Sequence, residues 1–278
     1  MELNLNNITF IIVSFKSEKV IDDCLKSLPK NSKIIVIENS NNYNLKKSLE
    51  LKYDNIEVLI SENNGMGASN NLGILKSETK FAYVLNPDAK FKKDTFENLV
   101  VAASKITDFA ILTPLNSNTK FPNFKIFKQN KNINDNIISV DSIVGFSMLI
   151  NKEKFVNKKF FDENIFLYLE DDDLCFRAKK NGQKIFVIKN SIIEHEGSSS
   201  SSIKNDPEFE YLRNWHWMWS KYYFNKKHYG ILIALIKILF NLISATFKYI
   251  FYFLTLNDYK KNIFKMRISG IINSILGN

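Results

Sequence analysis

The sequence lacks the cysteine pairs and the apolar leader of a secreted protein. Only two of its 278 residues are cysteines, Cys24 and Cys175, and both fall at apolar positions of helical patterns with no metal-ligand spacing. We therefore expect both thiols to be core residues of a protein in a reducing compartment. The first apolar run, residues 8–13, is too short for a signal sequence. These absences favour residence on the cytoplasmic side.

Acidic residues are scarce near the end of the chain. From residue 204 onward there are eleven Lys and Arg against four Asp and Glu, which supplies +7 of the net charge of +9. Because this tail is also strongly apolar, it favours an anionic membrane surface as its partner. A nucleic acid is usually bound by a polar basic face on a recognisable module, and we predict no nucleic-acid partner.

Short apolar runs alternate with helix-periodic segments from residue 8 onward. We predict strands at 8–15, 34–37, 56–60, 81–85 and 109–112, and helices at 20–28, 45–51, 68–75 and 94–101, the last opened by a capping box of Asp94 and Glu97. Alternation at this spacing predicts an α/β fold with a parallel, doubly wound sheet. In such sheets ligands bind beyond the C-terminal ends of the strands.

Polar or small residues follow four of these strands, at 14–17, 38–40, 63–71 and 86–88. The glycines of the third stretch let backbone approach a ligand closely. Its Gly-x-Gly follows the third strand and lacks the third glycine of a dinucleotide fingerprint, so it is a weak motif by itself. Asp88 lies in the turn after the strand at 81–85 and is either a turn residue or a ligand of a hard metal ion or a substrate.

The regular cycle ends after Pro114. Residues 116–136 are rich in Asn, Lys and Phe without clear periodicity, which favours a mobile flap. Strand character returns at 140–150 around Gly145, a position with little room for a Cβ. Two short strands are expected at 184–188 and 192–195. The second ends in His195, which is either a structural residue or a ligand.

Four adjacent carboxylates, residues 170–173, precede an apolar, helix-periodic run. A helix N-terminus accounts for one or two of them through the helix dipole. Four in a row raise one another's pKa and cost stability, so we interpret the cluster as a carboxylate held ready to take a proton. A purely structural helix start remains the alternative.

The tail combines aromatic with basic residues. All three tryptophans lie within 207–227, a pattern typical of a membrane-interface belt, with core packing as the alternative. Residues 229–256 are long enough to cross a bilayer. However, four polar residues share one face of this helix: Lys237, Asn241, Ser244 and Lys248.

We therefore predict a helix that lies in the membrane plane with its polar side up. Basic residues that follow it add attraction to anionic headgroups: Lys260, Lys261, Lys265 and Arg267. A spanning helix, and a helix pair that packs on a partner subunit, are the alternatives, and self-association of the chain stays open.

Seven motifs occur in the order seen in family 2 glycosyltransferases, which the chain resembles over residues 7–225. They are Ile11-Ile12-Val13-Ser14-Phe15, Glu38-Asn39-Ser40, Asn63-x-Gly65-x-Gly67-x-x-Asn70-Asn71-x-Gly73, Leu85-Asn86-Pro87-Asp88, Gly145-Phe146-Ser147-Met148-Leu149, Glu170-Asp171-x-Asp173-Leu174-Cys175-x-Arg177 and His195-x-Gly197-x-Ser199. The greatest similarity is to rhamnosyltransferase-like members that build bacterial surface polysaccharides. The resemblance implies a GT-A fold, a mixed, mainly parallel sheet flanked by helices, over residues 1–205, followed by a helical, membrane-associating tail at 206–278.

The resemblance also implies roles on the donor side. Ser14 and Phe15 line a base pocket, and Glu38, one methylene longer than the usual Asp, holds the base or ribose. The nucleoside floor is formed by Gly65 and Asn70. Two further substrate-binding residues are expected, Asn86, which stands where many members keep the first Asp of an Asp-x-Asp motif, and Gly145.

For the chemistry, the resemblance implies that Asp88 and His195 bind Mg²⁺ or Mn²⁺ near the diphosphate of a nucleotide sugar. Asp171 is the general base. The supporting residues orient this base, bind sugar hydroxyls or brace the carboxylates: Glu170, Asp173 and Arg177.

We thus predict an inverting glycosyltransferase, peripheral to the cytoplasmic side of the cell membrane. It moves rhamnose or another hexose from a nucleotide-diphosphate donor to a glycan or a lipid-linked acceptor. The alternatives are a non-catalytic nucleotide-sugar or glycan-binding protein and a nucleotidyltransferase. The sequence lacks the glycine-rich, basic loop that usually follows the first strand of a nucleotidyltransferase.

Overall fold

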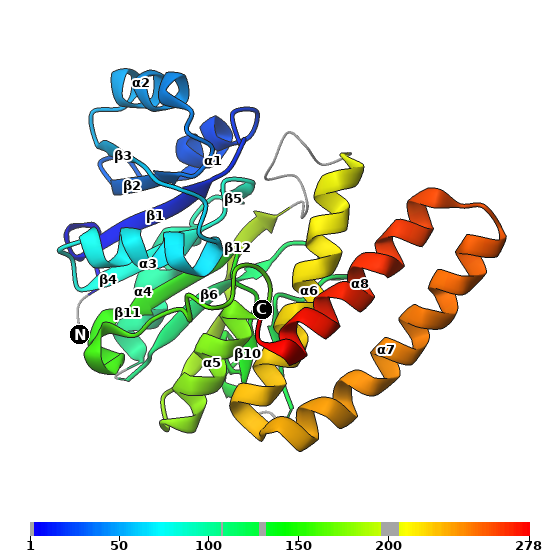
Figure 1. The fold of residues 1–278 in the computed structure, drawn as a ribbon. Coiled ribbons are helices and arrows are strands. Elements are labelled where there is room, and N and C mark those ends of the chain that lie inside the picture. Colours follow the sequence, from blue (N-terminus) through cyan, green and yellow to red (C-terminus); the bar gives the residue numbers. More distant parts are fainter. Residues whose placement is uncertain (1–2, 107, 128–131, 196–205) are drawn as a thin grey trace. The chain divides into compact units, whose positions relative to one another are not determined.

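The computed structural model describes residues 3–106, 108–127, 132–195 and 206–278 (Figure 1). The chain divides into two compact units, one formed by residues 1–163 and 170–202 and the other by residues 164–169 and 203–278. A short excursion of six residues thus belongs to the second unit. It ends immediately before the acid-rich helix, which begins at Glu170.

The first unit is built on a ten-stranded sheet. Its strands are β1 (Ile8–Ser14), β2 (Lys33–Glu38), β3 (Ile56–Ile60), β4 (Phe81–Leu85), β5 (Ala89–Phe91), β6 (Ile111–Asn116), β8 (Asn132–Asn134), β9 (Ile137–Ser139), β11 (Ser147–Asn151) and β12 (Ile185–His195). They are ordered β3-β2-β1-β4-β11-β6-β12-β9-β8, with β5 paired to β12. A separate antiparallel pair is formed by β7 (Phe124–Lys125) and β10 (Ser142–Ile143).

The sheet is mixed. Strands β1 to β4 run parallel to one another, as the alternating pattern predicts, and β6 is parallel to β12. β11 runs antiparallel between β4 and β6, so a purely parallel sheet is wrong and the mixed, mainly parallel α/β sheet is confirmed. The antiparallel direction places the start of β11 beside the end of β4, where ligands are expected.

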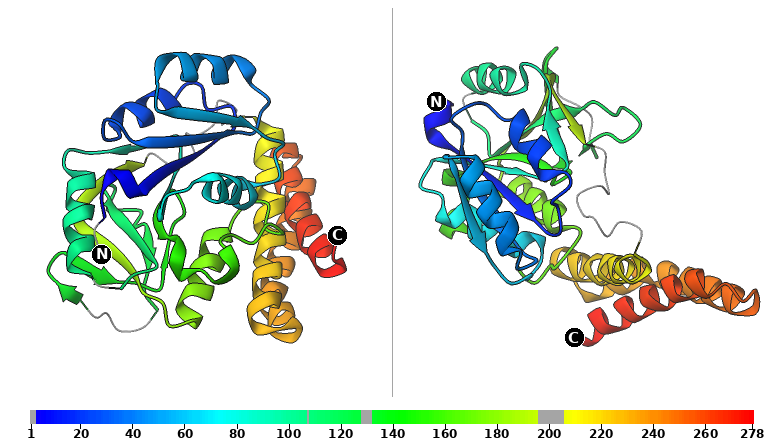
Figure 2. Two further views of the ribbon diagram at one scale, coloured as in Figure 1. Left: turned by 90° about the vertical axis from the view of Figure 1, so that its left-hand side faces the viewer. Right: turned by 90° about the horizontal axis from the view of Figure 1, so that it is seen from above.

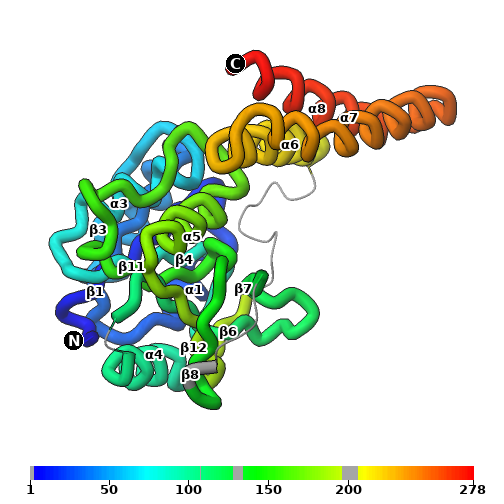
Figure 3. Tube along the Cα trace, turned by 90° about the horizontal axis from the view of Figure 1, so that it is seen from below, coloured from blue at the N-terminus to red at the C-terminus, as the bar shows by residue number. Residues whose placement is uncertain are grey.

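Helices cover both faces of this sheet (Figures 2 and 3). Side chains alternate along each strand, so Phe10 and Ile12 join one apolar cluster while Ile11 and Val13 join the other. The first cluster also includes residues of α1 (Ile21–Ser27), α2 (Tyr43–Lys52) and α4 (Thr95–Lys105), and the second includes residues of α3 (Met66–Lys76) and α5 (Glu170–Lys180). Both cysteines are free and buried in these clusters, as expected.

Two of the predicted strand patterns are wrong in detail. Residues 140–150 form β10 and β11 rather than one strand, and Gly145 lies in the connection between them. Its N–H bonds to a side chain instead of a neighbouring strand. Conversely, the two short strands predicted at 184–188 and 192–195 are one strand, β12, whose pairing with β6 shifts register between Ile188 and Ile192. Such an irregularity interrupts the apolar pattern without ending the strand.

Smaller differences concern turns and caps. β6 begins at Ile111 and continues to Asn116. The capping box is wrong, because Asp94 has a left-handed backbone (φ 60°) and its side chain makes no capping hydrogen bond. The predicted flap contains β7 and β8, and Asn123 ties it to β6 by donating to the Pro114 carbonyl at 2.8 Å. Short 3₁₀ turns occur at Leu5–Asn7, Lys152–Lys154 and Val156–Lys158.

The second unit contains three helices, α6 (Pro207–Tyr229), α7 (Ile231–Leu254) and α8 (Asp258–Leu276). α8 packs against both α6 and α7. Gly270 permits a close approach of α8 to α6, because a Cβ there would lie 2.3 Å from the Trp215 carbonyl oxygen. The small core of this unit consists of Met218, Tyr222, Ala234, Ile238 and Ile271.

Candidate active site

A carboxylate and an imidazole meet where β5 pairs with β12. The antiparallel register of these strands sets His195 opposite Ala89, so the preceding residue, Asp88, lies beside the imidazole. The distance from His195 Nε2 to Asp88 Oδ1 is 3.3 Å, and Asp88 is buried. The Phe146 ring stacks on the imidazole with centroids 4.0 Å apart and fixes its plane.

The Asp88–His195 pair suits a divalent cation. In the described part of the chain no three His, Cys, Asp or Glu side chains gather as a complete metal cage. Mg²⁺ in nucleotide sites is commonly held by one or two protein ligands together with phosphate oxygens and water, and imidazole with carboxylate also suits Mn²⁺. Two protein ligands at the end of β12 therefore fit a cation that is shared with a diphosphate.

Asp171 lies in the first turn of α5 and is held from two sides. Its Oδ2 accepts the Gly145 N–H at 2.7 Å, and its Oδ1 accepts the Asp172 N–H at 2.7 Å. Burial raises the pKa of Asp171, and the neighbouring charge of Asp172 adds to the increase. The side chain is only partly buried, so solvent reaches the carboxylate.

Glu170 lies next to the first turn of α3. A Cβ added to Gly67 would be 3.6 Å from the Glu170 Cβ, so a glycine in the small-residue loop makes room for this helix start. Within the described residues, the buried Oε2 of Glu170 has no hydrogen-bond partner. Burial and the charge of Asp171 both raise the pKa of Glu170.

A strained backbone leads into this acidic pair. Tyr168 and Leu169 both have φ of 68°, a left-handed conformation that L-residues with side chains rarely adopt. Such strain persists only where the surrounding structure imposes it, and it is concentrated at functional sites. The surrounding structure therefore fixes the backbone directly before α5.

The dipeptide Gly145-Phe146 joins the two halves of the site. Gly145 donates its N–H to Asp171, and the next residue, Phe146, stacks on His195. The carbonyl of Phe146 accepts the Asn86 N–H at 2.8 Å, which ties the turn that carries Asp88 to the same dipeptide. Asp171 and the Asp88–His195 pair thus share one edge of the sheet.

Asp173 and Arg177 lie on the other side of α5 from Asp171. Residues two apart on a helix differ by about 200° in direction. The fully buried Asp173 carboxylate accepts the Arg177 Nε–H at 2.8 Å, and the guanidinium also donates to the carbonyls of Lys159 and Phe160. Arg177 thus braces Asp173, as expected, but the structure does not bring either residue to Asp171.

Asp172 has a structural role. Its carboxylate accepts hydrogen bonds from Lys125 Nζ at 2.6 Å and from Ser142 Oγ at 2.6 Å. These bonds fasten α5 to the β7–β10 pair. Together with the Asp173–Arg177 pair, they explain two of the four adjacent acids without substrate.

On the donor side, polar atoms gather where β1 and β2 end. Ser14 Oγ and Asn39 Oδ1 are buried and have no hydrogen-bond partner in the described ranges. The Glu38 carboxylate accepts the Asn42 N–H at 2.7 Å and also bonds to the Ser40 backbone and hydroxyl, so it organises the turn after β2. Phe15, half-buried at the end of β1, lies 5.7 Å from Lys16 Nζ.

The small-residue loop is linked to this end of the sheet. Gly65 precedes α3 with φ of 99°, a conformation that requires glycine, and Asn70 is buried within α3. Ser69 donates to the Gly65 carbonyl at 2.8 Å and accepts a hydrogen bond from Asn39 at 2.5 Å. Asn39 therefore bridges β2 and α3.

Two residues of the site were not singled out by the sequence reasoning. Phe146 looked like an ordinary strand residue, and its stacking on His195 depends on strand order, which the local pattern does not contain. Asn39 sits between two residues of a matched motif. The polar stretch 38–40 is expected at a strand end, but the sequence predicts no role for Asn39 of its own within it.

Comparison with known proteins identifies the family. The model of Glycosyl transferase family 2 matches residues 9–175, more than half of the chain. The chain belongs to this family. The match extends from β1 into α5 and includes the turn that carries Asp88 and the acidic pair Glu170-Asp171.

The curated relatives of this chain are remote. The chain is 25% identical over 200 residues to the low-salt glycan biosynthesis hexosyltransferase Agl10 of Haloferax volcanii, an alignment that covers 65% of this chain and 64% of that protein. It is 27% identical over 217 residues to the rhamnosyltransferase WbbL of Escherichia coli, with 64% of this chain and 79% of that protein covered. The chain therefore spans slightly less than two thirds of the first of these relatives.

Solved structures share the fold. The mannosyltransferase PcManGT from Pyrobaculum calidifontis, in complex with GDP-Man and Mn²⁺, matches with a TM-score of 0.59 at 10% identity and covers 98% of this chain and 88% of its own. S. aureus TarS 1–349 with UDP-GlcNAc matches with a TM-score of 0.55 at 14% identity over 98% of this chain and 92% of its own. The predicted GT-A fold is confirmed.

Proposed function

We propose that this family 2 member is an inverting glycosyltransferase. It moves a hexose, with rhamnose the first candidate, from a nucleoside diphosphate to a hydroxyl of a glycan or lipid-linked acceptor in cell-surface polysaccharide synthesis. The observation that carries the proposal is the position of Asp171, a carboxylate with a raised pKa that is held by Gly145, one residue from the ring that orients His195. The similarity to Agl10 and WbbL, a hexosyltransferase and a rhamnosyltransferase, supports it.

Asp171 takes the role of general base in this reaction. The acceptor hydroxyl gives its proton to the carboxylate as its oxygen forms a bond to the anomeric carbon. The bond from that carbon to the diphosphate breaks, and its electron pair leaves on the phosphate oxygen. The raised pKa of Asp171 suits this step, because a base whose pKa is closer to the working pH accepts a proton more readily.

Asp88 and His195 would hold the Mg²⁺ or Mn²⁺ ion. PcManGT is described with GDP-Man and Mn²⁺, and the carboxylate–imidazole pair of this chain suits the same kind of ion. When bound, the ion neutralises charge on the diphosphate. Phe146 contributes by keeping the imidazole in the orientation that faces Asp88.

The ends of β1 and β2 would bind the nucleotide. Ser14 Oγ and Asn39 Oδ1 are buried polar atoms, and burying such groups without partners costs free energy. Hydrogen bonds from the ribose or base would remove that cost. Glu38 supports this surface by fixing the turn at Ser40 and Asn42.

The substitution Asp171→Asn tests the proposal. It keeps the shape of the side chain and removes its basicity, so sugar transfer should fall by about 10²–10⁴-fold while donor binding, measured by thermal shift across a panel of nucleotide sugars with Mn²⁺, survives. Asp108→Asn is the matched control, because it removes the same charge from an ion pair with Lys154 at the surface of the same unit. Unchanged transfer by Asp171→Asn would exclude Asp171 as the base. Donor binding without any transfer by the natural protein would favour a non-catalytic binding protein.

A further inference from the structure

Helix α7 exposes its apolar residues, whereas a helix on the surface of a water-soluble protein buries them. Toward the rest of the second unit, α7 buries only Ala234, Ile238 and Ala245, and the partly buried Asn241 accepts a hydrogen bond from Lys221 of α6 at 3.0 Å. Among the described residues it is the one helix long and apolar enough to cross a membrane, and only 17% of its most apolar window is buried. The apolar residues of α7 are therefore mostly on its outside.

The exposed apolar residues form one continuous stripe. At about 100° per residue they fall on the face opposite Ala234 and Ala245. The stripe consists of Leu232, Ile236, Leu239, Phe240, Ile243, Phe247, Ile250, Phe251 and Leu254, all exposed. It continues into the turn before α8, where Leu256 is 87% exposed. Soluble proteins rarely leave an apolar surface of this length open to water.

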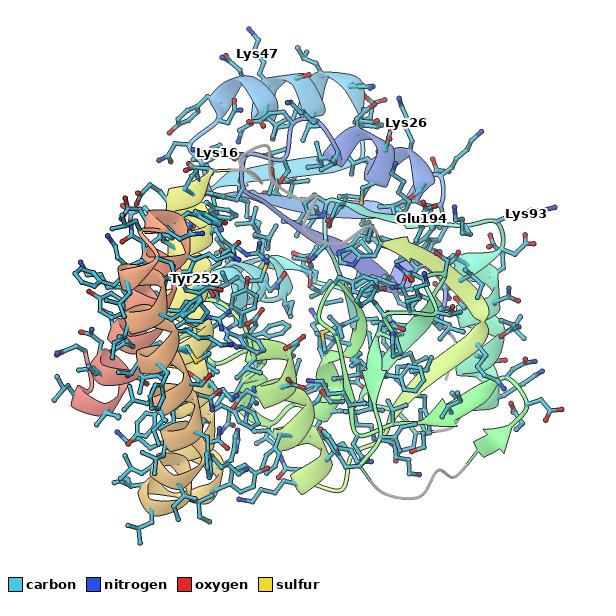
Figure 4. The ribbon with its side chains drawn as sticks, turned by 90° about the vertical axis from the view of Figure 1, so that its right-hand side faces the viewer. Lys16, Lys26, Lys47, Lys93, Glu194 and Tyr252 are labelled. Carbon is cyan, nitrogen blue, oxygen red and sulfur yellow. The ribbon has the colours of Figure 1, made fainter. Side chains whose placement is uncertain are left out.

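Two lysines run along one border of the stripe. Lys237 and Lys248 project from the same side of α7, and their ammonium groups lie over the rings of Tyr229 and Phe264 at 4.0 and 5.3 Å. Tyr252, labelled in Figure 4, stacks on Phe264 and continues this border. The adjacent α8 adds exposed Lys260 and Lys265. A basic border along an apolar stripe matches the boundary between acyl chains and anionic headgroups.

We propose that the α7 stripe, with the turn at Leu256, is a membrane-binding surface that lies in the plane of an anionic bilayer. The lysines favour this orientation over a spanning one. Lys237 and Lys248 lie about 16 Å apart along the axis, each about 8 Å from its midpoint. A spanning helix would place both inside the hydrocarbon core, whose half-thickness is about 15 Å.

A second copy of the chain is the competing occupant. In a symmetric dimer with antiparallel α7 helices the same patch faces itself, and the Lys237 and Lys248 borders of the two copies would be brought together in a low-dielectric interface. An anionic bilayer instead supplies the opposite charge. The proposal concerns where the protein binds and is independent of the transfer chemistry.

Vesicle binding by the full chain tests this surface. The natural protein should sediment with vesicles of 70% phosphatidylcholine and 30% phosphatidylglycerol, and Phe240→Ser/Phe247→Ser should lower its partition coefficient at least about tenfold. Phe121→Ser/Phe127→Ser is the matched control, because these rings are 71% and 75% exposed in the first unit and the replaced rings of α7 are 75% and 70% exposed. Circular dichroism verifies that both variants are folded.

The outcomes separate the occupants. Sedimentation of Phe240→Ser/Phe247→Ser equal to that of the natural protein overturns the proposal. The proposal is also overturned if the natural protein does not bind vesicles and is a dimer by light scattering, while Phe240→Ser/Phe247→Ser is a monomer. Lys237→Gln/Lys248→Gln should weaken binding to the phosphatidylglycerol vesicles and leave the weak binding to pure phosphatidylcholine unchanged.

Fluorescence decides the orientation. Both native thiols are buried, so a cysteine introduced on α7 is the accessible site for an environment-sensitive label. A label at Phe247→Cys should shift its emission to the blue when phosphatidylglycerol vesicles are added, and a label at Lys248→Cys should not. Equal blue shifts at both positions would show that both lie in hydrocarbon and would overturn the in-plane orientation.

Discussion

The two units of this chain distribute their apolar side chains in opposite ways. In the first unit the strands bury almost every apolar residue between two layers of helices, and Phe81 of β4 is 0% exposed. In the second unit the largest apolar side chains of α7 point outward, and Phe240 is 75% exposed. Hydrophobic periodicity identifies the elements in both units. It does not say whether the medium outside an apolar face is protein or lipid.

The largest expected effect compares one phenyl ring from each unit. Phe81→Ala should lower the free energy of unfolding by about 3–5 kcal/mol, because it leaves a cavity where the ring stacks on Phe109. Phe240→Ala should change it by less than about 0.5 kcal/mol, because its ring has little protein around it. Urea denaturation of the two variants, without lipid, measures the difference. A comparable loss for Phe240→Ala would mean that α7 buries this face against protein, and the contrast between the units would fail.

The next effect concerns a glycine in the site. A Cβ at position 145 would lie 3.0 Å from the Asp171 Cβ and 3.3 Å from its Oδ2, so Gly145→Ala should displace the base. We expect kcat to fall by about 10–100-fold, since small misplacements of a catalytic group are costly, with little change in donor affinity. The measurement is steady-state transfer combined with donor titration.

Gly182→Ala is the control for this prediction. Gly182 has φ of 72° and no atom within 4 Å of its added Cβ, so the change strains the backbone after α5 without touching the site. Gly182→Ala should lower the free energy of unfolding by roughly 1 kcal/mol and leave kcat unchanged. A similar loss of kcat in both variants would show that Gly145→Ala acts through α5 stability rather than through the position of Asp171.

Local pattern was sufficient for the first half of the sheet. β3 and β4 begin and end where the apolar runs do, because a buried parallel strand needs only a short apolar run between turn residues. The meeting of Asp88 and His195 is different. These residues are 107 positions apart, and their contact depends on the antiparallel register of β5 and β12, which no local pattern encodes.

The acidic cluster and the tail show the same limit. The run 170–173 predicts more than a helix cap, but it does not predict the different contacts of its members. These contacts come from neighbours on other elements, Gly145 for Asp171 and Lys125 for Asp172. On α7 the predicted polar face is present, yet Asn241 of that face turns toward α6, while Lys237 and Lys248 border the exposed stripe. Helical angles alone do not determine which neighbour lies against a face.

A smaller effect separates two serines of the second unit. The buried Ser220 of α6 donates to the Leu167 carbonyl at 2.8 Å, which fastens the excursion that precedes the acidic pair. Ser220→Ala should cost about 1–2 kcal/mol, because the carbonyl loses its partner. Ser244→Ala, on the exposed polar side of α7, should be neutral within about 0.5 kcal/mol. Thermal unfolding compares them, and equal values would argue that the excursion is not held by α6.

The smallest effect is a displacement of the pH profile by a fraction of a pH unit. Asp171 must be unprotonated to accept a proton, so transfer should rise with pH through its raised pKa. Asp172→Asn removes the negative charge that raises the pKa of Asp171. Lys125, whose positive charge lowers this pKa, stays nearby, so the pKa of Asp171 should fall. The acid limb of kcat/KM should therefore move to lower pH, whereas Asp108→Asn should not move it.

Stability should respond to pH in the opposite direction. The folded-state pKa values of Asp171 and Glu170 are raised by burial, so the stability that their protonated forms contribute is complete below the unfolded-state values near 4 and is lost as the pH rises through the raised values. Glu170→Gln should make the free energy of unfolding less dependent on pH in that range. An acid limb that stays in place in Asp172→Asn, together with an unchanged stability profile in Glu170→Gln, would mean that neither carboxyl is perturbed in solution. Asp171 would then lack the raised pKa that the proposed general base requires.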